Sequence, residues 1–127
     1  MITRHKFNIN KPLTDTGVNP VYDAGGVRAY GTLEQLRWQP TTQDTGPAAV
    51  GTITIWAQPE KTTDTGLAQI VFNEPGIVLG NDRTLSISDT GSAFKPSYVL
   101  AGELLRARMM PADTGLVDGN LFVYVKD

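Results

Sequence analysis

The residues of this sequence with the clearest chemical potential are five aspartates, each beginning an Asp-Thr-Gly tripeptide: Asp15, Asp44, Asp64, Asp89 and Asp113. Two aspartates that lie close enough to share one proton can supply the general acid and the general base for cleavage of a peptide bond. A single copy would therefore suggest acid–base catalysis. Five copies raise a second interpretation, in which one turn sequence is used repeatedly in a small β protein.

The first interpretation is a dimeric aspartic protease of the retroviral type, in which each chain contributes one catalytic aspartate. In such enzymes two apolar strand residues precede the aspartate, and none of the five copies here has that context. Asp89, which follows Ile87 and Ser88, comes nearest, but the apolar segment ending in Gly at 77–80 precedes it instead of following it. A motif counts only in its structural context, so a protease that uses Asp89 is our third hypothesis.

The second interpretation is that each tripeptide forms a turn. Aspartate accepts hydrogen bonds from the backbone N–H groups that follow it, and glycine adopts positive φ without steric cost. One predicted strand separates Asp44 from Asp64, so these two should lie at opposite ends of the sheet, and the same holds for Asp89 and Asp113. A calcium site needs roughly six to eight oxygen ligands. Asp113 and Asp118 could supply two, so calcium binding stays open.

The elements that must position these turns are predicted to be strands. Residues 50–57 show the clearest pattern, because Ile53 and Ile55 alternate with threonines. Residues 98–109 contain strong helix formers, yet we favour a strand there because every neighbouring segment has a β pattern. The full set of predicted strands is 7–9, 27–38, 50–57, 67–72, 77–79, 84–88, 98–109 and 121–126.

This pattern predicts an all-β fold, an antiparallel β-sandwich of the jelly-roll or immunoglobulin-like kind, over residues 27–127. Residues 1–26 are rich in proline and glycine, which interrupt regular elements. We therefore predict an extended N-terminal arm over 1–26, with only a short strand at 7–9.

Composition removes several classes of function. The 127 residues include no cysteine and one histidine, so neither thiolate chemistry nor a multi-histidine metal site is expected, and no cofactor is predicted. The net charge is −2, and the one basic cluster lies at residues 4–11, which argues against nucleic-acid binding. We expect no signal peptide and no membrane segment.

Aromatic and apolar residues at strand positions are the remaining candidates for a contact surface. Aromatic rings at such positions most often pack in a core or an interface. Trp38 and Trp56 could instead stack on sugars, and a carbohydrate- or surface-binding module is our second hypothesis. The residues predicted to form an interface are Phe7, Ile9, Trp38, Trp56, Tyr98 and Tyr124.

The last third of the chain resembles small all-β structural proteins of tailed bacteriophage virions. The resemblance rests on a strand ending at 105–111, a glycine-rich turn at 113–119 and a closing strand at 121–125. It implies a non-enzymatic decoration, minor capsid or neck protein, made in the host cytoplasm and located in the virion. Such a protein would bind capsid or neck proteins through its arm and strand edges and form homo-oligomers, as trimers or rings.

Overall fold

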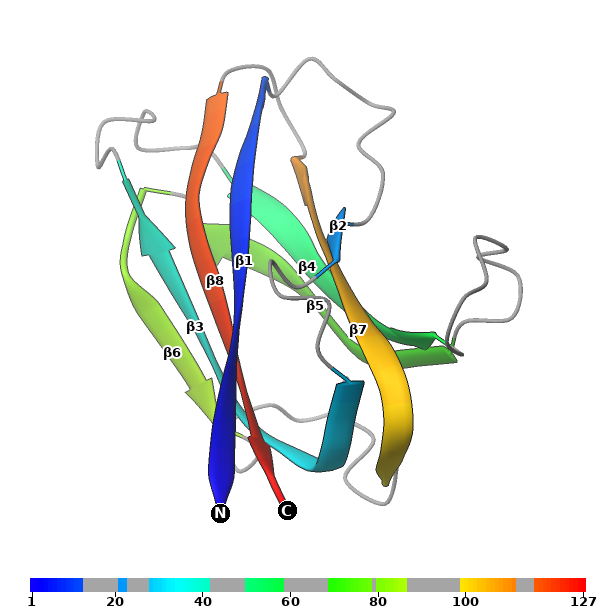
Figure 1. Cartoon of the computed structure of the whole chain (residues 1–127). Helices are drawn as coiled ribbons and strands as arrows, with labels where there is room; N and C mark the ends of the chain where they lie inside the picture. The colour runs from blue at the N-terminus through cyan, green and yellow to red at the C-terminus, as the bar shows by residue number, and fades with distance from the viewer. Residues whose placement is uncertain are drawn as a thin grey trace.

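In the computed structural model, the described part of the chain forms eight β-strands (Figure 1). The structure describes residues 1–12, 21–22, 28–41, 50–58, 69–78, 80–86, 99–111 and 116–127, and these ranges contain no helix. The strands are β1 (Ile2–Pro12), β2 (Val21–Tyr22), β3 (Arg28–Pro40), β4 (Val50–Gln58), β5 (Gln69–Val78), β6 (Arg83–Ser86), β7 (Leu100–Pro111) and β8 (Leu116–Lys126). The predicted all-β class is confirmed.

The strands belong to one antiparallel sheet in the order β1-β8-β3-β7-β4-β5, in which β6 also pairs with β3 and β2 also pairs with β7. This order places β1 beside β8, although the two strands come from opposite ends of the sequence (Figure 1). We call β1, β8, β6 and the second part of β3 the β8 half. We call β2, β7, β4 and β5 the β7 half.

Strand β3 joins the two halves at a corner. It pairs with β7 through Arg28–Gly31 and with β8 through Thr32–Pro40. Gly31 has a φ of 114°, and register irregularities follow Ala29 and Leu33 on either side of it. Glycine and β-bulges let a strand bend sharply. The corner of β3 therefore lies at Gly31.

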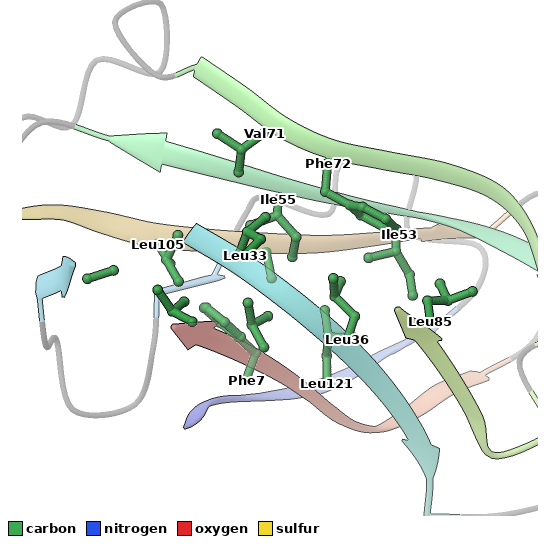
Figure 2. Packing of buried hydrophobic residues seen from close by; sticks show 14 of the residues in the cluster. Phe7, Leu33, Leu36, Ile53, Ile55, Val71, Phe72, Leu85, Leu105 and Leu121 are labelled. Atoms are coloured by element: carbon green, nitrogen blue, oxygen red, sulfur yellow. The ribbon is translucent and has the colours of Figure 1, made fainter. Parts of the chain in front are cut away.

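The two halves face each other across a hydrophobic core. Figure 2 shows Ile53, Ile55 and Phe72 of the β7 half pointing toward Leu36 and Leu121 of the β8 half. Burial of each such side chain stabilises the folded state by about 1.5–3 kcal/mol relative to its exposure to water. The alternation predicted for residues 50–57 is confirmed, because Ile53 and Ile55 face this core and Thr54 and Trp56 lie on the opposite face.

Two ambiguous segments are resolved as strands. The residues from Leu100 to Pro111 form β7 without any helical turn, as predicted. The described residues of the separate strands predicted at 67–72 and 77–79 instead belong to one strand, β5, which runs through Pro75 and Gly76. Proline is tolerated there because β5 is an edge strand, and Gly76 adopts a φ of 75° beside it.

The N-terminal arm predicted over residues 1–26 is not confirmed. Residues 2–12 pair with β8 along their whole length in a continuous register. Phe7 and Ile9 on this strand are 0% and 2% exposed, so β1 is part of the sheet and of the core. The prediction underestimated the length of this strand. Its partner β8 lies more than a hundred residues away in the sequence, and the local pattern of residues 2–12 does not reveal that partner.

Candidate functional site

The five Asp-Thr-Gly tripeptides all lie outside the described residues. Each falls in the sequence between two successive strands, and the strands that separate Asp44 from Asp64 and Asp89 from Asp113 are β4 and β7. The turn prediction is compatible with these strand bounds and stays a prediction. In the ranges that the structure describes, no three acidic or histidine side chains gather closely enough to hold a metal ion.

The residues predicted to form an interface divide into an inner and an outer group. Phe7, Ile9 and Trp38 have at most 2% of their surface exposed and pack inside this chain's own core. A ring must be exposed to stack on a sugar, so Trp38 cannot serve as such a platform in this fold. Trp56 and Tyr124 are half-buried on outer faces of the sheet, and Tyr98 lies outside the described residues.

The outer face of the β7 half carries a cluster of polar side chains. The Nη1 atom of Arg106 donates a hydrogen bond to Oε1 of Gln58 at 2.6 Å, and both side chains are buried. The guanidinium of Arg108 lies 4.9 Å from the centroid of the Trp56 ring. Its Nε has no acceptor among the described residues. A stacked guanidinium still has free N–H groups at its edge, so this pair could recognise an anionic or sugar-like group.

The outer face of the β8 half is basic and partly aromatic. Lys6, Phe122 and Arg37 lie side by side in one cross-strand row, and Arg4 lies opposite Tyr124 in the next. The Arg4 guanidinium is 4.8 Å from the centroid of the Phe122 ring. Phe122 is only 8% exposed, and the Arg4 guanidinium helps to cover its apolar ring.

One carboxylate at the border of this face is paired with Arg37. The Nη2 and Nε atoms of Arg37 donate hydrogen bonds to the two carboxylate oxygens of Asp82 at 2.8 and 3.2 Å. The hydrogen bond from Arg37 holds the pKa of Asp82 below its ordinary value, and the same bond raises the pKa of Arg37. Both groups are exposed, so the pair is fully subject to screening by salt.

The free edge of β1 is a further surface that our sequence analysis did not identify. In the described part of the chain, β1 pairs with β8 alone, and it also contacts β2 and β7 without pairing with them. Met1 and Asp127 exchange two hydrogen bonds, with N–O distances of 3.1 and 2.9 Å, so they form a closely bonded antiparallel pair. Bonded and non-bonded pairs alternate along such a ladder. Among residues 1–9, the backbone groups that point away from β8 therefore belong to Ile2, Arg4, Lys6 and Asn8.

A signal for this edge was present in the sequence. His5, Phe7 and Ile9 are buried and alternate with the exposed residues Arg4, Lys6 and Asn8, which is the period-2 pattern of a strand with one buried face. Our prediction limits the strand to 7–9 because proline and glycine are frequent in residues 1–26. The pairing order, which makes β1 an edge strand, was not visible in that pattern.

Comparison of the chain with known protein families, with curated proteins and with solved structures finds no match. No helix in the described ranges could span a membrane. Within the described ranges, the fold and its surfaces thus define an all-β protein whose sheet ends in two long edge strands, β1 and β5, and has two polar outer faces.

Proposed function

We propose that this chain is a non-enzymatic structural protein of a phage-like particle, which binds and stabilises capsid or neck proteins through its strand edges. The domain is taken to be a β-sandwich, of either the jelly-roll or the immunoglobulin-like kind. The observation that carries the proposal is the outer edge of β1, an 11-residue strand that pairs on one side only among the described residues. An unpaired strand edge presents a row of backbone donors and acceptors to other chains.

The character of the sheet faces supports this proposal. In the described residues the polar side chains are dispersed over two broad outer faces, where they pair with each other or stack on aromatic rings. Broad faces with alternating polar and aromatic groups suit contacts with other proteins. Assembly as trimers or rings would use heterologous contacts, in which a strand edge of one copy meets a different surface of the next.

The oligomeric state in solution tests the assembly part of the proposal. Size-exclusion chromatography with light scattering, over a range of protein concentrations, should show a trimer or a larger ring. A monomer at every concentration would contradict self-assembly. Arg108→Ala is a control for a change on the outer face of the β7 half, because Arg108 takes no part in the β1–β8 ladder and the variant should leave assembly through β1 intact.

A carbohydrate- or surface-binding module is the second candidate. The observation that favours it is the pair formed by Trp56 and Arg108 on the outer face of β4 and β7. Binding to a glycan array that disappears in Trp56→Ala would establish this function. Trp38→Phe is the control, because a buried ring has no role in sugar stacking and the variant should bind normally if it folds.

A dimeric aspartic protease that uses Asp89 remains the third candidate. It predicts peptide cleavage at acidic pH that is lost in Asp89→Asn and retained in Asp44→Asn. Absence of cleavage by the unmodified protein would remove this candidate.

A further inference from the structure

We infer that the open edge of β1 binds an extended acidic segment of a partner protein, which adds to the sheet as a further antiparallel strand. This inference rests on the proposed function, because it names the chemistry of the partner at one of the proposed strand edges. It is derived from the direction of the backbone groups along β1 and from the charges beside them.

The backbone of β1 offers a regular set of hydrogen-bonding groups. Ile2, Arg4, Lys6 and Asn8 each direct one N–H and one C=O away from β8, by the alternation that begins at the bonded pair of Met1 and Asp127. The register of β1 with β8 has no bulge, so these groups recur at every second residue. An added strand would bond to all four residues, as in other cases of β-strand addition.

The side chains of the same four residues lie on the outer face of the sheet. In an antiparallel pair, directly opposite residues share one face and lie close together. Arg4 and Lys6 would therefore meet two side chains of the added strand that are two residues apart. Oppositely charged cross-strand pairs are favourable and like-charged pairs are unfavourable, so carboxylates at alternate positions fit this edge.

The position of Arg4 strengthens the preference for carboxylates. Its guanidinium lies over the Phe122 ring, 4.8 Å from the centroid, which limits its motion. A guanidinium stacked in this way still offers the N–H edge that binds a carboxylate with two hydrogen bonds. Lys6 lies opposite Phe122 in the register of β1 with β8, so both cations extend from the same small area.

A second copy of β1 is a poor occupant of this edge. Symmetric antiparallel pairing centred on residue 5 would place Arg4 of each copy opposite Lys6 of the other. Centring on residue 4 would place Arg4 opposite Arg4, and centring on residue 6 would place Lys6 opposite Lys6. Charged residues on edge strands commonly prevent such self-pairing, so these three registers are unfavourable, whereas an acidic strand would meet both cations with opposite charge.

The test uses synthetic peptides and the folded chain. The probe is a peptide of about nine alternating threonine and glutamate residues, a usual strand length; its counterparts carry lysine or glutamine in place of glutamate. We expect the glutamate peptide to bind at least about tenfold more tightly than the lysine peptide, given favourable against unfavourable cross-strand pairs. Equal binding of the two peptides would overturn the inference.

Two variants separate strand addition from simple charge attraction. Lys6→Pro removes an N–H that points away from β8, so the β1–β8 ladder keeps its bonds and the peptide should lose at least about tenfold in affinity. Lys6→Gln keeps the N–H and removes the charge, so it should bind the glutamine peptide as the unmodified protein does. Retention of full affinity for the glutamate peptide by Lys6→Pro would overturn the inference.

Amide hydrogen exchange on the unmodified protein provides a readout if Lys6→Pro fails to fold. The glutamate peptide should slow exchange at the amides of Ile2, Arg4, Lys6 and Asn8, and should leave His5 and Phe7, which already bond to β8, nearly unchanged. Slowing at every amide of β1 alike, or at none, would contradict strand addition. A monomeric protein whose amide exchange slows at these alternate residues would contradict the proposed self-assembly and would still support strand addition.

Discussion

Gly31 is the position at which one added methyl group should damage the fold most directly. It lies at the corner where β3 passes from β7 to β8, and its φ of 114° is a conformation that residues with a Cβ rarely adopt. A Cβ at this position would lie 2.1 Å from the backbone oxygen of Lys126 and 2.9 Å from Cα of Asp127. These contacts are with backbone atoms, which cannot move aside as the tip of a flexible side chain can.

The cost of Gly31→Ala has two parts. Adopting a sparsely populated backbone conformation costs about 1–3 kcal/mol. Relief of the clash requires the end of β8 to move away from β3, which weakens one or two ladder hydrogen bonds at about 0.5–1.5 kcal/mol each. The free energy of unfolding should therefore fall by about 2–6 kcal/mol, a large share of the roughly 5–15 kcal/mol typical of a domain.

Gly76→Ala is the matched control for this variant. Gly76 also has a positive φ, 75°, but a Cβ there would have no atom within 4 Å. Only the conformational part applies, so the loss should be about 1–2 kcal/mol. Urea unfolding followed by tryptophan fluorescence measures both losses, provided that the dependence on urea keeps the same slope. If Gly31→Ala costs no more than Gly76→Ala, the close approach of β3 and β8 at this corner is refuted.

Three further predictions concern side chains. Phe72→Ala leaves a cavity at a fully buried site and should lower the free energy of unfolding in urea by about 3–5 kcal/mol. Ile70 is 45% exposed, so Ile70→Ala should cost far less. Similar losses would contradict the burial of Phe72 and the exposure of Ile70. Gln58→Leu removes one acceptor of the buried Arg106 guanidinium and should cost about 1–3 kcal/mol, while an unchanged stability would show that this hydrogen bond is dispensable. Asp82→Asn should lower the melting temperature at pH 7, because the lowered pKa of Asp82 contributes stability above its unfolded value near 4. This difference in melting temperature should vanish as the pH falls through the pKa of Asp82 in the folded protein. It should also vanish in about 1 M salt. A difference that persists at low pH would exclude the ion pair with Arg37 as its cause.

The fold class followed from the sequence because each central strand carries its own local signal. Ile53 and Ile55 alternate with threonines, and the alternating residues of the closing strand behave in the same way, so the period of 2 was readable without knowledge of the partners. In β3 the register with β8 shifts between Leu33 and Gln35. Glu34 therefore interrupts the alternation of inward and outward side chains along this strand. A bulge of this kind interrupts an alternation but leaves the strand intact.

The candidate surfaces could be predicted only in part, because they depend on which strands are neighbours. Trp38 and Trp56 have similar local sequences, each followed by a Gln-Pro pair, directly in one case and after one alanine in the other. One ring nevertheless points into the core and the other outward. The outer row of Lys6, Phe122 and Arg37 joins residues from three distant segments, and no local pattern connects them. The free edge of β1 follows from the strand order alone.

The pairing of β1 with β8 also has a consequence for the order of folding. The residues that meet in this ladder are separated by about a hundred positions or more, so most of the chain must be synthesised before β1 has a partner. Contacts this distant in sequence slow folding, since a large loop must close before any hydrogen bond is gained. During synthesis β1 would present both of its edges, and Arg4 and Lys6 would then keep nascent chains from pairing with one another.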